Sequence, residues 1–135
     1  MPVSIKIADG GQGIVLTAQG YLTIQEVSQA NLDFFEQYAQ EFLSCRYWLV
    51  DGSQIEATDG DFAQIHRLAS IHIQASNVNP ELVFAVYSTK DYVLGLARMW
   101  KMLAEATGWE IRIFRSAEDA KVWIRSSVNE SLIFK

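Results

Sequence analysis

Apolar residues recur along this chain with two different periods, one typical of strands and the other of helices. Val3 to Ile7 alternates apolar and polar residues, as a half-buried strand does, and Ile14 to Ala18 is a second strand-like run. Between them, Asp9-Gly10-Gly11-Gln12-Gly13 contains glycines that permit the positive φ angles of a hairpin turn. The pattern therefore predicts an N-terminal hairpin over residues 3–18.

Two later apolar runs are short and nearly continuous, which is typical of strands buried on both faces. They cover Tyr47 to Asp51 and Leu82 to Tyr87, and a further strand is predicted over Glu110 to Phe114. The segments around these runs follow the period of amphipathic helices. Helices are predicted over residues 23–43, 61–76, 90–107 and 116–128, and a loop over 52–60.

Strands that alternate with amphipathic helices indicate right-handed crossovers and a sheet that is parallel at least in part. We therefore expect a single α/β domain over residues 1–135, with a mixed sheet. It combines the N-terminal hairpin with βα units over residues 20–128 and an apolar tail over 129–135. The pattern gives this domain about four helices.

Three of the predicted helices begin with a hydroxyl residue that is followed three positions later by a carboxylate. A hydroxyl at the N-cap accepts a hydrogen bond from the third helical amide, and a Glu three positions on returns one to the cap. The pairs are Thr23 and Glu26, Ser88 and Asp91, and Ser116 and Asp119.

Composition and charge exclude several classes of function. The net charge of −5 and the scattered basic residues disfavour a nucleic-acid partner, which needs a basic face. Cys45 is the only cysteine, so neither a disulfide framework nor a thiolate metal site is expected. The chain shows no signal peptide, and no apolar run reaches the roughly 20 residues that span a bilayer. These features predict a soluble cytoplasmic protein without an integral membrane segment.

The candidate metal ligands have simpler interpretations. His66 and His72 are six residues apart on one helix, which turns them to different sides, so we interpret both as packed, hydrogen-bonded histidines. Asp59 and Asp61 could hold a cation with Glu56, but their place at the start of a helix is explained by capping and the helix dipole. No metal is predicted.

Two further motifs also lack the partners that chemistry requires. Cys45 stands next to Arg46, but a nucleophile needs a positioned base, and a buried, inert thiol is the preferred interpretation. The glycines at 10, 11 and 13 are followed by a strand and not by Lys-Ser/Thr, which disfavours a phosphate cradle. No cofactor is expected, and no catalytic residue is assigned.

Polar residues follow the predicted parallel strands at their carboxyl ends, where open α/β sheets bind ligands. The simpler alternative is that Ser88 and Ser116 only cap helices. The candidate ligand residues at this edge are Asp51, Ser53, Ser88, Thr89 and Arg115.

The helix over residues 90–107 carries two apolar stripes. The first, which we expect in the core, comprises Val93, Ala97, Trp100 and Ala104. The second stripe comprises Tyr92, Gly95, Met99, Met102 and Ala106. It is either a protein interface or a surface that Leu132-Ile133-Phe134 covers. Trp100 and Trp123 are both expected to be buried.

Taken together, four segments resemble the STAS-like (SpoIIAA-like) domain family of bacteria. They are Gly20 to Thr23, Tyr47 to Ser53, Val93 to Trp100 and Ile113 to Ile124, within a match over residues 20–125. The resemblance implies a mixed sheet with helices packed largely on one side. It also implies a non-enzymatic interaction or switch module.

The chain departs from the switch members of that family at one place. In those members, an Asp-Leu-Ser strand end is followed by an Asp-Ser-Ser-Gly-like turn whose serine is phosphorylated. Here Asp51-Gly52-Ser53 fits the first element, but Asp59-Gly60-Asp61 occupies the second and contains no serine. Thr58 is the one neighbouring hydroxyl, and Asp61 mimics a phosphate only in part. The closer likeness is to members without the phosphoswitch, and Thr58, Asp59 and Asp61 join the candidate crevice.

These observations predict a non-enzymatic regulatory module that binds protein partners and forms a homodimer through the second stripe. The alternative is a protein that binds a lipid-like or anionic small molecule in the crevice at the strand ends. A pocket lined by aromatic residues would favour the alternative, and a flat apolar helix surface would favour the module.

Overall fold

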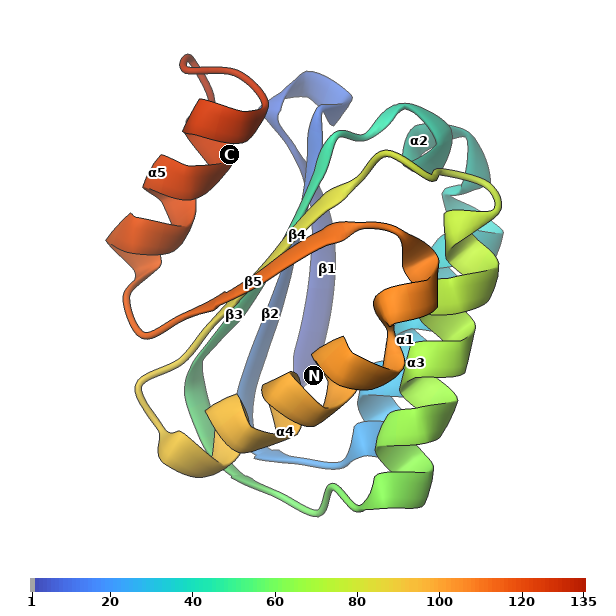
Figure 1. The fold of residues 1–135 in the computed structure, drawn as a ribbon, viewed down its shortest axis with the longest axis vertical. Coiled ribbons are helices and arrows are strands. Elements are labelled where there is room, and N and C mark those ends of the chain that lie inside the picture. The colour runs from blue at the N-terminus through green and yellow to red at the C-terminus, as the bar shows by residue number, and fades with distance from the viewer. Residues whose placement is uncertain (1) are drawn as a thin grey trace.

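The computed structural model describes residues 2–135, and one five-stranded sheet forms its centre (Figure 1). The strands, in their spatial order, are β1 (Val3–Ala8), β2 (Gly13–Leu22), β3 (Tyr47–Thr58), β4 (Val83–Tyr87) and β5 (Glu110–Phe114). β1 pairs antiparallel with β2, and all later pairs are parallel. This is the mixed α/β sheet that the sequence predicts, with the hairpin closed by a short turn η1 (Asp9–Gly11).

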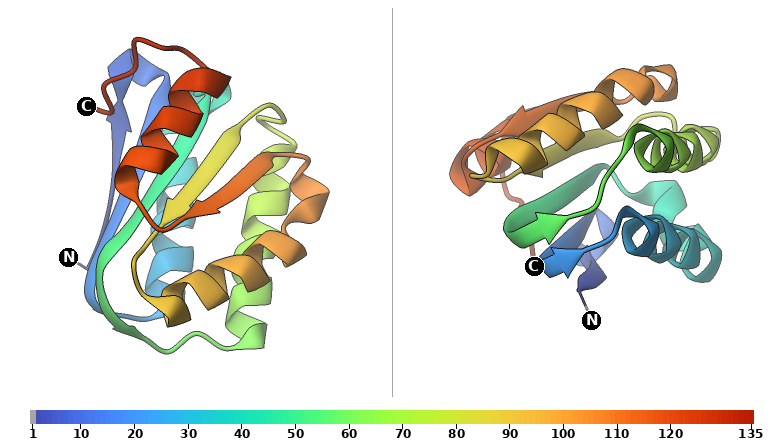
Figure 2. Two further views of the ribbon diagram at one scale, coloured as in Figure 1. Left: turned by 60° about the vertical axis from the view of Figure 1, so that its left-hand side comes forward. Right: turned by 90° about the horizontal axis from the view of Figure 1, so that it is seen from below.

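Five α-helices connect and cover these strands. They are α1 (Ile24–Gln37), α2 (Ala39–Ser44), α3 (Phe62–Ser76), α4 (Asp91–Leu103) and α5 (Ala117–Ser127), with a short turn η2 (Glu105–Thr107) after α4. The parallel strands follow one another in a single direction, so right-handed crossovers place α1, α3 and α4 on the same face. The chain then turns back after β5, and α5 covers the opposite face (Figure 2).

Alternate residues of β3 and β4 supply the two halves of the core. Trp48 and Phe84 point to the face covered by α1, α3 and α4, whereas Tyr47 and Ala85 point to the face covered by α5. All four side chains are at most 2% exposed. Because both faces are covered, both strands have the nearly continuous apolar sequence from which they were predicted.

Most helix boundaries agree with the capping chemistry. Thr23 and Glu26 form the predicted reciprocal capping box at the start of α1. Ser116 accepts a hydrogen bond from the amide of Asp119 at the start of α5. The prediction at Ser88 is wrong: α4 begins at Asp91 after Lys90, which provides no side-chain cap, and Ser88 lies before the helix. Asp61 instead forms a capping box with Gln64 at the start of α3.

Two predicted boundaries differ from the structure. The first predicted helix is interrupted at Tyr38, whose φ of −120° and ψ of 40° separate α1 from α2. The predicted loop over residues 52–60 is wrong, because β3 continues to Thr58 and pairs with the far end of β2 as far as Leu22. The actual loop before α3 spans only three residues, 59–61.

The C-terminal tail packs on the α5 face of the sheet. Leu132 and Phe134 are 2% and 7% exposed and belong to the same cluster as Tyr47, whereas Ile133 is 64% exposed. The rings of Tyr47 and Phe134 lie 5.2 Å apart between centroids. The tail therefore does not cover α4, and the expectation that it could seal that helix is wrong.

The carboxylate of Asp9 links this tail to the hairpin turn. It accepts hydrogen bonds from the amides of Ile133 and Phe134, both at 2.8 Å, and from the hydroxyl of Tyr47 at 2.7 Å. Burial alone would raise the pKa of Asp9, but these hydrogen bonds together lower it below its usual value.

Candidate functional site

The eight candidate crevice residues do not converge on one site. Asp51 lies level with Tyr87 and, through the β4–β5 pairing, with Phe114. Because β3 runs on beyond Asp51 to Thr58, the segment from Thr58 to Asp61 lies at the far end of the β2–β3 ribbon. The candidate residues therefore lie at two separate places along the sheet, although the sequence pattern predicts them together at one edge.

Most of these residues are engaged in local structural bonds. Asp51 accepts hydrogen bonds from the amide and hydroxyl of Ser53, at 3.0 and 2.6 Å. Ser88 is fully buried, donates to the carbonyl of Gly52 at 3.1 Å and accepts from the amide of Lys90 at 3.2 Å. Burial, followed by the nearby Asp51 carboxylate, raises the pKa of Tyr87.

The remaining charged candidates are also accounted for by structure. Asp59 accepts a hydrogen bond from the first amide of α1, that of Ile24, at 3.0 Å. Arg115 forms an ion pair with Asp91 at 2.7 Å, and both side chains are more than half exposed. Thr89 is exposed. Thr58 is the exception, because its hydroxyl oxygen is buried and has no hydrogen-bond partner among residues 2–135.

The structure places the two histidines and the cysteine in different environments. His72 is 3% exposed, as predicted, but His66 is exposed and lies beside the ring of Phe62, so the prediction that both are packed is wrong for His66. Cys45 is buried, as predicted, and burial raises the pKa of its thiol to about 12. Within residues 2–135, no three His, Cys, Asp or Glu side chains are grouped so that they could hold a metal ion.

A chain of hydrogen bonds fixes the state of His72 between three helices. The indole N–H of Trp100 donates to His72 Nδ1 at 3.0 Å. Because an indole only donates, Nδ1 is the acceptor, and Nε2 carries the proton that it donates to Asn31 Oδ1 at 2.9 Å. Asn31 in turn donates to the carbonyl of Val27 at 2.8 Å. Burial lowers the pKa of His72 to about 3, so the ring is neutral.

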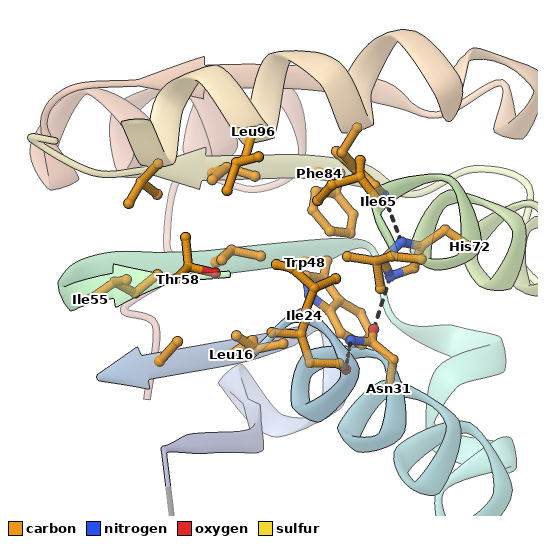
Figure 3. A pocket seen from close by; sticks show the side chains of 18 residues that line it. Leu16, Ile24, Asn31, Trp48, Ile55, Thr58, Ile65, His72, Phe84 and Leu96 are labelled. Carbon is orange, nitrogen blue, oxygen red and sulfur yellow. Dashed lines mark hydrogen bonds between the residues drawn. The ribbon is translucent and has the colours of Figure 1, made fainter. Parts of the chain in front are cut away.

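Next to this chain lies an apolar pocket that the sequence does not predict. It has a volume of about 110 Å³ between the sheet and helices α1, α3 and α4. Its walls include Trp48, His72 and Phe84 at one end and Ile55 and Thr58 at the other (Figure 3), and Trp100 and Leu96 line it from α4. Among the predicted crevice residues, Thr58 alone contributes to it.

The second apolar stripe of α4 is mostly uncovered. Tyr92 is 43% and Met102 67% exposed, and Gly95 and Ala106 are exposed as well. Met99 is half-buried against the core. An added Cβ at Gly95 would meet no other atom of the chain within 4 Å. Tyr92 donates its hydroxyl to the backbone carbonyl of Glu56, which fixes the ring at the start of the stripe.

The two tryptophans predicted to lie in the core differ in how deeply they are buried. Trp100 is 4% exposed, as predicted. Trp123 is only half-buried, against the ring of Phe114 and under the guanidinium of Arg112, so its predicted burial is wrong. Trp123 is one of the partly buried side chains that pack around the buried cluster on the α5 face.

Comparison with solved structures identifies the fold. The chain is similar to an uncharacterized protein of the DUF3478 family with a SpoIIAA-like fold from Shewanella loihica PV-4, with a TM-score of 0.52, 12% identity and coverage of 90% of this chain and 91% of that chain. It is also similar to the anti-sigma factor antagonist SpoIIAA in its unphosphorylated form, with a TM-score of 0.59, 11% identity and coverage of 94% and 99%. The chain therefore has the SpoIIAA-like, or STAS, fold.

Sequence comparisons add nothing to this result. No protein-family model matches the chain, and no curated protein matches it. The resemblance drawn from the sequence is thus confirmed by structure, at the level of the fold. No helix within residues 2–135 is both long and apolar enough to cross a membrane.

Proposed function

We propose that this protein is a non-catalytic, cytoplasmic regulatory module that acts by binding proteins, and that it pairs with a second copy of itself through α4. The SpoIIAA-like fold supports the first part, because one solved protein with this fold is named as an antagonist of an anti-sigma factor. The local bonds of Asp51, Ser53 and Ser88 support it too, since those side chains brace the fold.

The observation that carries the pairing is the uncovered α4 stripe, defined as Tyr92, Gly95, Met99, Met102 and Ala106. The tail, which could have covered it, packs on the opposite face of the sheet. A row of exposed apolar side chains on one helix is unusual in a monomer. Tyr92 and Met102 are side-chain types that are enriched at protein interfaces.

The composition of the α4 stripe favours a second copy as the occupant. All five of its residues are uncharged, so two copies of the stripe can meet without repulsion between like charges. A two-fold axis near the middle of the stripe brings two α4 helices together antiparallel, which pairs the stripe with itself. Gly95 lets the two backbones approach closely, because it has no side chain and the space that a Cβ would face is open.

Gly95→Leu tests this pairing with little risk to the fold. The new side chain points into open space, and leucine favours a helix more than glycine does, so the folded monomer should be retained. At the pairing surface, the same side chain holds the two helices apart. Ala63→Leu, at an exposed position of α3, is the matched control.

Sedimentation equilibrium at micromolar concentration is the measurement. The proposal expects wild type and Ala63→Leu at a mass near twice 15.2 kDa, and Gly95→Leu as a folded species near 15.2 kDa. A wild type that sediments as a clean monomer would overturn the pairing. Dimers of equal affinity in all three proteins would place the interface elsewhere.

A further inference from the structure

The indole nitrogen of Trp48 is buried without a hydrogen-bond partner. Trp48 is 1% exposed, yet its Nε1 contacts no acceptor within residues 2–135. The other two buried tryptophans are satisfied: Trp100 donates to His72 at 3.0 Å, and Trp109 donates to the carbonyl of Asn79 at 2.8 Å. A buried donor without a partner is unfavourable and rare, so this one requires an explanation.

The second buried polar side-chain atom without a partner, Thr58 Oγ1, lines the same pocket as Trp48. Figure 3 shows Thr58 on β3 with its hydroxyl oxygen directed toward the interior of the pocket. His72 and Asn31 also line the pocket, but each of their polar side-chain atoms already has a hydrogen-bond partner. The pocket is thus apolar apart from two unused polar atoms.

Water is a poor occupant of such a space. A buried water needs two to four polar partners, and Trp48 and Thr58 are ten positions apart on β3, so one molecule does not bridge them. Apolar cavities of about 150 Å³ stay dry and take up benzene. The volume of about 110 Å³ here is of the same order. Leu96 and Ala97, which line the pocket, are partly exposed and give it an entrance.

The surroundings select an uncharged ligand. No charged side chain lines the pocket, and His72 is fixed in its neutral form by its two hydrogen bonds. The carboxylate of Asp59 binds the amide of Ile24, itself a lining residue, and so places negative charge beside the pocket. Burial of a charge here would be strongly unfavourable, and an anion would also be repelled.

We propose that this pocket binds a small, neutral, largely hydrocarbon molecule that carries one carbonyl or ether oxygen. The hydrocarbon part fills the space between Phe84, Ile65 and Leu96, and the oxygen accepts the indole N–H of Trp48. This site is separate from the α4 stripe and does not depend on whether two copies pair.

Cyclohexanone and methylenecyclohexane form a matched pair of probes, because they differ only in an oxygen or a CH₂ group at one position. Each is titrated into ¹⁵N-labelled wild type while the indole N–H signals are followed. The indole N–H signal that is missing from the spectrum of Trp48→Phe is thereby assigned to Trp48. We expect saturable binding of both probes, with a downfield shift of the Trp48 indole proton for cyclohexanone only.

Two variants test the location and the role of the donor. Ala97→Leu fills the pocket from α4 and should weaken the binding of both probes at least about tenfold. Ala63→Leu, on the exposed side of α3, should leave the binding of both probes unchanged. Trp48→Phe enlarges the pocket for both probes alike but removes the donor. It should therefore weaken the binding of cyclohexanone by about fivefold to tenfold relative to that of methylenecyclohexane.

Three results would overturn the proposal. The first is no saturable binding of either probe by the folded wild type. The second is binding that Ala97→Leu leaves intact, which would place the probes elsewhere. The third is a Trp48 indole signal that does not respond to bound cyclohexanone, which would remove the assigned acceptor. Failure of α4 pairing would change none of these readouts.

Discussion

The two faces of the sheet are both apolar and both covered, but they differ in how completely their polar groups are used. On the α5 face, the hydroxyl of Tyr47 and the amides of Ile133 and Phe134 all donate hydrogen bonds to the carboxylate of Asp9. On the face covered by α1, α3 and α4, Trp48 Nε1 and Thr58 Oγ1 have no partner and line a pocket. The α5 face is thus organised for stability, whereas the opposite face retains unused binding capacity.

The two sides of the sheet also differ in whether a further segment of the chain packs against them. The α5 side receives Leu132 and Phe134 of the tail. The α4 stripe receives no segment of the chain and leaves Tyr92 and Met102 exposed. Both candidate binding features, the pocket and the stripe, therefore lie on one side of the sheet and share helix α4.

The largest effect should follow from removing the central aromatic side chain of the pocket face. Trp100→Ala leaves a cavity and deprives His72 of its donor, so it should lower the free energy of unfolding by about 3–5 kcal/mol. Trp123→Ala, on the α5 face, should lose only about 1–2 kcal/mol because Trp123 is half-buried. Chemical denaturation measures both, and equal losses would show that the two tryptophans are buried alike.

A smaller effect is expected on the α5 face from Asp9→Asn. The amide keeps one acceptor oxygen but loses the charge that binds Tyr47 and the tail, which should lower the free energy of unfolding by about 1–2 kcal/mol. The amides of Ile133 and Phe134 should also exchange with solvent faster. Unchanged exchange at these two amides would mean that Asp9 does not hold the tail.

The two faces should also respond differently to acid. His72 has a pKa of about 3 in the folded protein and about 6.5 when unfolded, so the unfolded chain binds the extra proton between these values. Stability from this residue is therefore complete above pH 6.5 and is lost as the pH falls, by up to about 1.4 kcal/mol per unit. His72→Gln should remove this part of the slope between pH 6 and 4 in denaturation experiments. An identical slope in the variant would contradict the buried neutral histidine.

The pKa of Asp9 is also lowered in the folded protein. Its folded pKa lies below the unfolded value of about 3.9, so its contribution is complete above that value and is lost only as the pH falls through the folded pKa. The slope at pH 5–6 should therefore be nearly the same in Asp9→Asn and wild type, because the unfolded carboxyl binds its proton mainly below that range. A change of slope in that range would indicate that Asp9 titrates higher than its hydrogen bonds imply.

The fold was predictable from the sequence because its signals are local. The strand at Glu110–Phe114 and the cap at Thr23 lie within single elements, and both agree with the structure. The second half of β3 was missed because Gln54 and Glu56 look like loop residues, although Ile55 between them is buried. Pairing with the far end of β2, a long-range contact, makes this segment a strand.

The candidate site was less predictable, since it depends on residues that meet only in the folded chain. The polar strand-end residues were identified as a group, but the extension of β3 separates Asp51 from Thr58. The pocket draws Trp48, Ile65 and Trp100 from β3, α3 and α4, and no spacing in the sequence reveals a space between them. Only the α4 stripe, which is a helical periodicity, was visible in advance.

Spin labels placed at α4 test the central claim, pairing through this helix, most directly. Cys45 is buried with a raised thiol pKa, so a single added cysteine takes the label. Arg98→Cys places a label beside the α4 stripe, and Val122→Cys places one on the exposed side of α5. Dipolar spectroscopy should give one short distance between copies for Arg98→Cys and a much longer one, or none, for Val122→Cys. The absence of coupling between copies at Arg98→Cys, or a shorter distance at Val122→Cys, would contradict the account.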